Sequence, residues 1–149
     1  SLPGQMSLAM RQYYAQPRNA FWKITGELFG FDPRLDYAAR TAALAGRGVA
    51  LWDVCAAAVR PGSLDARIRR DTVVPNEFVP FLLAHRQIRR LCFNGATAFE
   101  LFERLVVPTM PASLQALTRI RLPSTSPAHA GMSHADKLAR WRDALVMEG

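Results

Sequence analysis

The sequence predicts an α/β fold, specifically a three-layer α/β/α sandwich with a mostly parallel four-stranded sheet. Three short segments, 49–54, 88–94 and 117–122, are apolar on both faces, as strands of a buried parallel sheet are. Segments with helical periodicity alternate with them, which predicts helices on both sides of the sheet. Because the chain opens on a turn at Pro3-Gly4, we expect the first of the four strands to lie upstream of residue 1.

The stretch QYYAQPRNAFW at 12–22 fits neither an amphipathic helix nor an alternating strand. It predicts a shaped loop that runs into a helix over 20–29, with Asn19 as the N-cap. Aromatic rings beside an arginine and an amide are what a pocket for a flat, polar ring needs. The alternative is that these rings belong to the core, which we favour for Phe21 and Trp22, whereas one of the adjacent tyrosines is expected to face a crevice.

The rest of the chain continues the alternation. Further helices are predicted at 35–44, from a cap at Asn76 to Ala84, from 96 to about 104, and from a cap at Ser133 onward. A turn is predicted at 60–63, a short helix or loop at 63–70, and a loop at 123–132. In the last helix, the side chains expected to face the core are Leu138, Trp141 and Leu145.

Ligands of open α/β sheets bind at the carboxyl ends of the strands. Here that edge would carry Asp53, Asn94 with Gly95, and the segment 124–129. Asp53 is a candidate general base, although a structural role at a strand end is favoured. Asn94 has the alternative role of a strand-to-helix turn residue. The hydroxyl groups and prolines of the loop suit phosphate contact or insertion into a base stack, and the alternative is a plain surface connection.

Composition limits the class of protein. The 149 residues are predicted to form one domain over 1–149, and no apolar run approaches the ~20 residues of a membrane span, so no membrane partner is expected. The net charge of +7, mostly from arginine, is equally compatible with a polyanion partner and with an arginine-rich proteome. Cys55 and Cys92 lie in apolar runs without metal-type spacing, which predicts buried free thiols in a reducing cytoplasm and no metal or cofactor.

Familiar catalytic motifs are missing. The sequence contains no G-x-S-x-G nucleophile elbow and no glycine-rich phosphate loop of either common kind. Its three histidines, His85, His129 and His134, make a hydrolytic triad poorly supported. The candidate chemistry therefore rests on amides, aromatic rings and the hydroxyl-rich loop.

Five motifs occur in order along the chain: P-G-x-x-S-L (3–8), Y-Y-A-x-P-R-N-A-F-W (13–22), A-L-W-D-V (50–54), F-N-G (93–95) and L-P-S-T-S-P-A (122–128). Together they resemble the mismatch-specific branch of the uracil-DNA glycosylase superfamily, closest to the hypoxanthine-DNA (deoxyinosine) glycosylase family. The resemblance covers essentially the whole chain, and the second and last motifs are its specific part. It implies a mostly parallel four-stranded sheet between helices.

The resemblance also implies roles for individual residues. Asn19 would be catalytic and orient the attacking water. The substrate-binding residues would be Pro3 and Gly4 near the flipped sugar, Tyr14 stacked on the extruded base, and Asn94 at the polar edge of the base. The DNA-binding residues would be Ser124, Thr125, Ser126, Pro127 and His129 of the inserting loop; Arg18 is a candidate phosphate contact, equally well explained as part of a solvated basic face.

Two positions depart from the family pattern. The first motif carries Ser1 where the uracil and thymine relatives have a catalytic asparagine or aspartate, and Gln16 stands where relatives often have histidine. We predict a monomeric, monofunctional DNA glycosylase that removes deaminated bases, hypoxanthine first and uracil in mismatches second, from single- or double-stranded DNA in base excision repair. The alternatives are a non-catalytic DNA-binding or damage-sensing module and, more weakly, an α/β domain that binds a free nucleotide.

Overall fold

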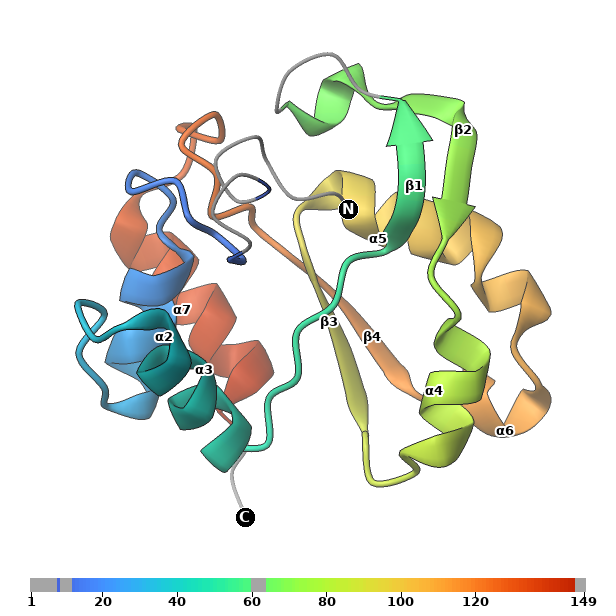
Figure 1. Cartoon of the computed structure of the whole chain (residues 1–149), viewed down its shortest axis with the longest axis horizontal. Helices are drawn as coiled ribbons and strands as arrows, with labels where there is room; N and C mark the ends of the chain where they lie inside the picture. The colour runs from blue at the N-terminus through green and yellow to red at the C-terminus, as the bar shows by residue number, and fades with distance from the viewer. Residues whose placement is uncertain (1–7, 9–11, 60–63, 147–149) are drawn as a thin grey trace. The chain divides into compact units, whose positions relative to one another are not determined.

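The computed structural model describes residue 8 and residues 12–59 and 64–146. The chain divides into two compact units. We call Asp53–Ser124 the strand unit, and we call the described residues up to Trp52 together with those from Thr125 onward the helical unit. Figure 1 labels the helices and strands of both units.

The described strands of the strand unit pair as two two-stranded sheets. Strand β1 (Cys55–Val59) runs antiparallel to β2 (Arg69–Pro75), and β3 (Arg90–Asn94) runs parallel to β4 (Thr118–Leu122). In the parallel pair Asn94, the last residue of β3, is opposite Leu122, the last residue of β4. The two carboxyl ends therefore coincide, as the sequence predicted for these two strands.

Helix α5 (Ala96–Leu105) packs against both β3 and β4. Phe93 of β3 and Phe102 of α5 are both buried, and their ring centroids lie 4.9 Å apart. The same core includes side chains around α4 (Phe78–Ala84) and α6 (Ala112–Gln115). Two 3-10 turns complete the described unit, η1 (Asp65–Arg67) and η2 (Val107–Thr109).

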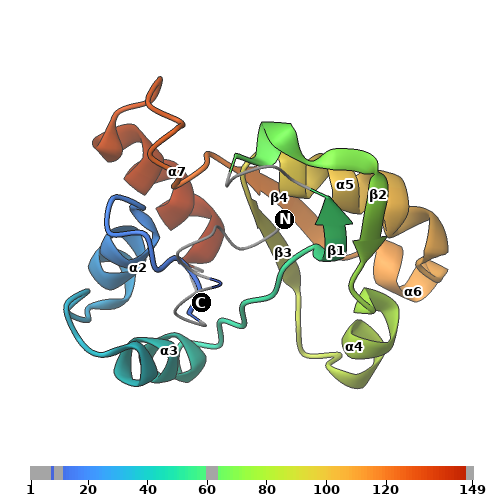
Figure 2. The ribbon, with the colours of Figure 1, turned by 45° about the horizontal axis from the view of Figure 1, so that its top comes forward.

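The helical unit contains α2 (Phe21–Phe29), α3 (Tyr37–Gly46) and α7 (His134–Leu145). Helix α2 packs against α3 and α7, and the three are grouped in Figure 2. Phe21 is central to this packing because its ring makes edge contacts with the rings of Trp22 and Trp141, at 4.9 and 5.9 Å. The rings of Phe21 and Trp22 are buried, as predicted.

The helix ends follow local sequence signals. Gly30 adopts a left-handed conformation (φ 77°) and closes α2, because glycine has no Cβ to oppose it. Ser133 caps α7 by accepting a hydrogen bond from the Asp136 N–H at 3.1 Å, as predicted. Helix α3 begins at Tyr37 rather than at residue 35, because the Asp36 carboxylate accepts from the Ala39 N–H at 2.8 Å.

Several predicted strand boundaries were wrong. Residues 49–54 do not form a strand, and the strand that follows starts at Cys55. Asn76 is not a helix cap: its side-chain amide donates to the Asp53 carbonyl at 2.7 Å and its N–H donates to the Val54 carbonyl at 2.9 Å. These bonds join the residue that follows β2 to the two residues that precede β1. The short helix or loop predicted over 63–70 is confirmed by η1 at Asp65–Arg67, except that β2 already begins at Arg69.

The α/β class and the parallel pairing of β3 with β4 are confirmed, whereas a single four-stranded sheet is not what the described strands form. No helix of the described residues has the length and apolar character needed to cross a membrane.

Candidate functional site

Tyr14 has an unusual backbone and a fixed ring. Its φ of 55° lies in the left-handed region, the only described non-glycine residue to do so. Its ring stacks on the buried Phe21 ring, with centroids 4.0 Å apart and planes 23° apart. The backbone strain is of order 1–3 kcal/mol, and an aromatic pair contributes ~0.5–1.5 kcal/mol, so the stack offsets part of the strain. It holds the half-buried Tyr14 ring against the start of α2.

Asn19 holds the first turn of α2. Its Oδ1 accepts a hydrogen bond from the Phe21 N–H at 3.0 Å, and its own N–H donates to the Gln16 carbonyl at 3.0 Å. The helix N-cap is Ala20, so the predicted position of Asn19 was wrong by one residue although its side chain still satisfies a helix N–H. An amide oxygen has two lone pairs and the amide nitrogen has two N–H donors. The cap bond uses only one of these four bonding positions.

The loop after β4 is bonded to the same helix start. The Ala20 N–H donates to the carbonyl of Thr125 at 3.0 Å, and the Thr125 side chain is buried. Beyond it, the Ser126 hydroxyl accepts from the Ala128 N–H at 3.2 Å and the Ser126 carbonyl accepts from the His129 N–H at 3.0 Å. The helical unit thus brings Tyr14, Arg18 and Asn19 to the same end of α2 as residues 125–129.

A groove of about 240 Å³ lies where this loop, the start of α2 and α7 meet, and we call it the loop groove. Lys137 of α7 is buried there, with its Nζ donating to the His129 carbonyl at 2.6 Å. Burial lowers the pKa of the Lys137 ammonium. The loop groove is lined by Arg18, Ala20, Thr125, Ser126, Pro127, His129, Ala130, Met132, His134 and Lys137.

Lys137 and the loop groove were missed in the sequence, although a signal was present. Lys137 stands four residues before Trp141 and seven before Ala144, so all three share one helical face. That face is the buried face of α7. The predicted core residues Leu138 and Leu145 are only partly buried, and Trp141 alone of the three predicted residues is fully buried.

In the strand unit, Asn94 ends β3 and Gly95 makes the turn into α5. The Gly95 N–H lies 3.0 Å from the carbonyls of Phe93 and Leu122, and its φ is 99°. A Cβ added to Gly95 would come within 3.3 Å of the Ser124 Cβ. The F-N-G turn and the first hydroxyl residue of the loop therefore lie side by side, as the register of β3 and β4 requires.

The remaining predicted residues fall elsewhere. Pro3 and Gly4, with Ser1, lie outside the described residues. Asp53 is half-buried, precedes β1 instead of ending a strand, and its backbone carbonyl is bound by Asn76; the role of its carboxylate stays a prediction. Cys55 and Cys92 are free thiols, the first buried and the second half-buried.

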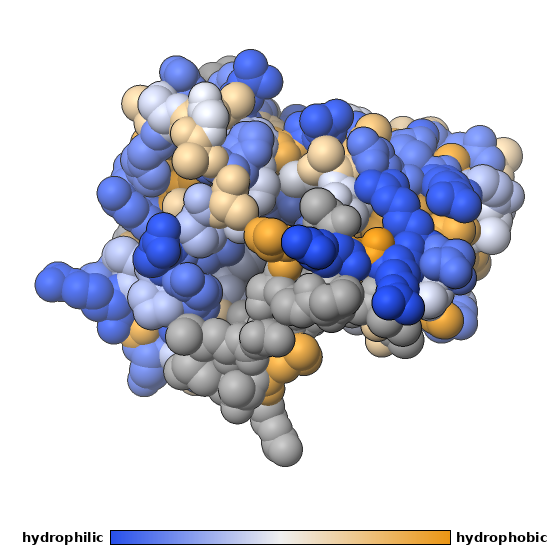
Figure 3. All heavy atoms as spheres, turned by 90° about the horizontal axis from the view of Figure 1, so that it is seen from above, coloured by the Kyte–Doolittle hydropathy of each residue, from blue (hydrophilic) through white to orange (hydrophobic). Residues whose placement is uncertain are grey.

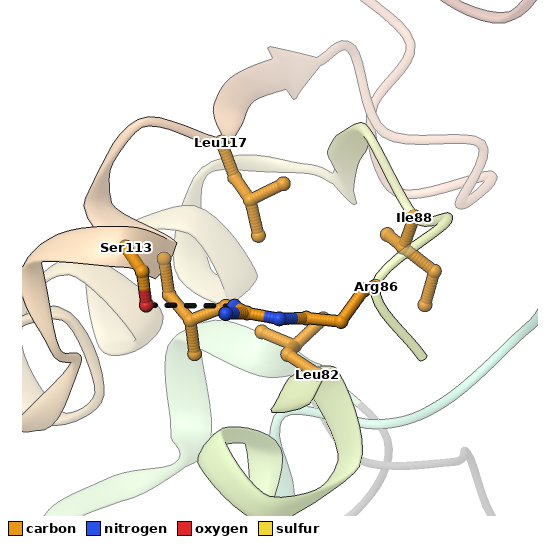
Figure 4. A pocket seen from close by; sticks show the side chains of 6 residues that line it. Leu82, Arg86, Ile88, Ser113 and Leu117 are labelled. Atoms are coloured by element: carbon orange, nitrogen blue, oxygen red, sulfur yellow. Dashed lines mark hydrogen bonds between the residues drawn. The ribbon is translucent and has the colours of Figure 1, made fainter. Parts of the chain in front are cut away.

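A second cavity of about 250 Å³ lies in the strand unit and is lined mostly by aliphatic side chains from α4, α6 and their flanking loops (Figure 4). The Arg86 guanidinium lines this cavity and donates a hydrogen bond to the Ser113 hydroxyl at 3.4 Å. The other lining residues are Leu82, Ile88, Leu114 and Leu117. Polar groups that could recognise a base or a sugar are sparse there, so this cavity is a poor candidate site.

The exterior is mostly hydrophilic on the face shown in Figure 3. Figure 3 shows strongly hydrophilic side chains over much of one face, broken by small apolar patches. Large exposed apolar residues are scattered along the described chain, for example Leu35, Trp52 and Val74. Isolated exposed apolar residues are normal for a protein surface.

No family model matches the chain. Over 101 residues, or 67% of its length, it is 34% identical to two proteins named hypoxanthine DNA glycosylase, from Methanosarcina barkeri and Methanosarcina acetivorans, and it spans 63% of the length of each. It is also similar to the NMR structure of a proposed uracil DNA glycosylase from Methanosarcina acetivorans. That similarity has a TM-score of 0.75 at 30% identity and covers 97% of this chain and 86% of the other. The order of motifs, the parallel β3–β4 pair and these similarities show that the chain belongs to the uracil-DNA glycosylase superfamily, close to the hypoxanthine-DNA glycosylases.

Proposed function

We propose that the protein is a monofunctional DNA glycosylase that hydrolyses the N-glycosidic bond of deaminated bases, hypoxanthine first and uracil in mismatches second, in base excision repair. The observation that carries this proposal is the arrangement at the start of α2. There the Phe21 N–H holds Asn19, the Phe21 ring holds the Tyr14 ring, and the Ala20 N–H holds the loop at the Thr125 carbonyl. The names of the similar proteins support the same activity.

The reaction asks for little covalent chemistry from the protein. A base in a duplex is out of reach of water at its sugar, so the nucleotide is first flipped out, at a cost of a few kcal/mol that is smallest for a mispaired base. Breaking the glycosidic bond then develops positive charge on the sugar and negative charge on the leaving base. Positioned water and amide groups lower this barrier without a strong nucleophile.

In this proposal Asn19 orients the attacking water through the bonding positions that its cap bond leaves over. The Tyr14 ring, whose orientation is fixed by its stack on the Phe21 ring, stacks on the extruded base. Asn94 hydrogen-bonds the base, because an amide both donates and accepts and a hypoxanthine edge carries both an N–H and a carbonyl. Pro3 and Gly4 are assigned next to the flipped sugar by the motif alone.

The loop is proposed to enter the duplex at the site of the extruded base. Pro127 and its neighbours supply an apolar tip, and the hydroxyl groups of Ser124, Thr125 and Ser126 and the imidazole of His129 supply polar contacts. Arg18 is exposed beside this loop, and in this proposal its guanidinium contacts a phosphate of the DNA backbone. We infer that one chain suffices and that the step needs no metal or cofactor, and we place the enzyme in the cytoplasm.

The test is base release from duplexes that contain one inosine or one uracil, read as alkali-labile abasic sites. Asn19→Ala should lower the rate at least about a hundredfold, as loss of a positioned hydrogen-bonding group does. It should also lower the free energy of unfolding by ~1 kcal/mol, because the Phe21 N–H loses its acceptor.

Asn19→Ser separates the two effects. Serine is a good acceptor for helix N–H groups, so stability should be largely kept, but its shorter side chain cannot reach the same water. Loss of activity in both variants with stability lost only in the alanine variant supports the proposal. Normal turnover by a folded Asn19→Ala protein contradicts the role of Asn19.

A second candidate function rests on the first motif, where Ser1 replaces the asparagine or aspartate of the uracil and thymine relatives. In that case the protein is a DNA-binding or damage-sensing module without catalysis. Salt-sensitive binding to inosine-containing duplexes with no base release from any substrate would establish it.

A further inference from the structure

The loop groove contains a buried cation, Lys137, for which the described part of the chain supplies no counter-ion. Lys137 is 7% exposed, and the one hydrogen bond of its ammonium group among the described residues goes to the His129 carbonyl. No described carboxylate lies within ion-pair distance of its Nζ. An ammonium group has three N–H donors, so the carbonyl satisfies only part of it.

This arrangement is costly in the free protein. Charged groups are rarely buried unless they are paired, because desolvation disfavours the charged form. The lowered pKa of Lys137 is the direct consequence of that burial. An anion bound in the loop groove would stabilise the charged form of Lys137 and so replace the hydration that burial removes.

The other lining residues favour an anion. Arg18 is exposed at the groove, the Ser126 hydroxyl and the imidazoles of His129 and His134 line it, and none of its lining residues is acidic. Outside the lining, the Glu27 carboxylate lies 3.2 Å from the His134 Nε2. A groove with one buried and one exposed cation and a hydroxyl group fits a tetrahedral oxyanion.

We propose that the loop groove binds one phosphate of the DNA backbone, with Lys137 as the buried cation and Arg18 as the exposed one. This inference rests on the proposed function, since DNA is its ligand. Because Lys137 also holds the His129 carbonyl, the phosphate and the loop that enters the duplex share one side chain. A bound phosphate would therefore stabilise the loop in the shape that contacts DNA.

The first test measures binding to a lesion-free duplex by fluorescence anisotropy at several salt concentrations. Removing one phosphate contact lowers the slope of log affinity against log salt by about one. Lys137→Met should show that fall, whereas Lys137→Arg, which keeps the charge, should keep the slope. Arg18→Gln, which changes an exposed side chain and is therefore expected to keep the fold, should also lower the slope by about one.

Lys23→Met is the matched control, because Lys23 is the chain's other lysine and is exposed on α2. It removes the same charge and should leave the slope unchanged. An equal fall in both lysine variants means that net charge alone is responsible and overturns the proposal. Circular dichroism at the binding temperature identifies any variant that is unfolded. If Lys137→Met is unfolded, the salt slopes of Arg18→Gln and Lys137→Arg test the proposal.

The second test replaces single phosphates of the duplex by neutral methylphosphonates. One position should weaken wild-type binding about tenfold, the effect of one charge-assisted hydrogen bond, and have no effect on Lys137→Met. If every position affects both proteins equally, the groove holds no backbone phosphate. Saturable binding of inorganic phosphate at Lys137 without any such position identifies a free-phosphate site and also overturns the proposal.

These outcomes separate the two proposals. Base release by wild-type protein with an unchanged salt slope in Lys137→Met overturns the phosphate site and leaves the glycosylase activity standing. Absence of DNA binding by the wild-type protein overturns both. Salt-sensitive binding with the expected Lys137 effect but no base release supports the phosphate site and overturns catalysis.

Discussion

Asn19 combines a structural bond with the chemistry proposed for it. Its Oδ1 is fixed in direction by the Phe21 N–H, which removes the rotamer freedom that a water-positioning amide would otherwise lose on reaching the transition state. The neighbouring Tyr14 is fixed in the same way by its stack on Phe21. One buried phenylalanine thus orients both residues, through its backbone N–H and through its ring.

The thiol of Cys92 leads to a prediction about the pH dependence of stability. Burial raises the pKa of its thiol, and the charge of Arg90 partly opposes the rise. As pH increases, the unfolded chain loses its thiol proton first, near pH 8.5, so the folded state is progressively destabilised above that pH. Below it, both states hold the proton and Cys92 has no effect on the pH dependence.

Cys92→Val removes this contribution. The free energy of unfolding of the wild-type protein, measured in urea, should fall between pH 7.5 and 10 relative to that of the valine variant. The thiol of the folded protein should also react slowly with a disulfide reagent at pH 8. A difference between the two proteins that stays constant across this pH range contradicts the raised pKa.

At the scale of elements, the turn from β3 into α5 depends on Gly95. Its φ of 99° is disfavoured for any side chain, and its position 3.0 Å from two carbonyls fixes the backbone at the carboxyl end of the sheet. The adjacent Asn94 is proposed to read the base. The geometry of that proposed contact is therefore set by a residue without a side chain.

Gly95→Ala should destabilise the protein by about 1–3 kcal/mol, because the new Cβ meets both an unfavourable φ and the Ser124 Cβ at 3.3 Å. Gly46→Ala is the matched control, since Gly46 ends α3 and a Cβ added there would meet no atom within 4 Å. It should change stability little or raise it by up to about 1 kcal/mol. Thermal unfolding of both variants checks this, and equal stability of the two would refute it.

Local signals were sufficient for some elements. The cap at Ser133 and the end of the first predicted helix at residue 29 were correct, because such cap geometry involves only neighbouring residues. The parallel pair β3 and β4 was recognisable from short apolar runs, with boundaries shifted by one or two residues. The predicted juxtaposition of Gly95 with Ser124 followed from that pairing.

Other features depend on contacts between distant segments. Strand β2, RRDTVVP, begins with three exposed charged residues, so its sequence lacks the apolar pattern of a strand. Asn76 resembled a helix cap because its bonds to Asp53 and Val54 join residues that are more than twenty positions apart. Lys137 was missed because a lysine is assigned to solvent by type, although its spacing to Trp141 places it on the buried face of α7.

At the scale of the molecule, the proposed chemistry draws on both units. Tyr14, Asn19 and the residues from Thr125 to His129 belong to the helical unit, and Asn94 belongs to the strand unit. Each unit has its own buried side chains, centred on Phe102 in one and on Phe21 in the other. We therefore expect the units to differ in their response to denaturant.

The aromatic cluster around Phe21 makes this difference visible by spectroscopy. Trp22, Trp52 and Trp141 are the only tryptophans of the chain, and all three belong to the helical unit. Two are buried, and Trp52 is 44% exposed, so a Trp52→Phe variant would leave only the buried pair to emit. Tryptophan emission is then an intrinsic optical probe of one unit, whereas far-UV ellipticity records both.

In urea, the emission and ellipticity transitions should have different midpoints, and Gly95→Ala should shift the ellipticity transition while leaving the emission transition in place. Coincident curves in both proteins would mean that the chain unfolds as one cooperative body. Because all three tryptophans lie in the helical unit, their emission reports specifically on the unit that carries Asn19, without an added dye.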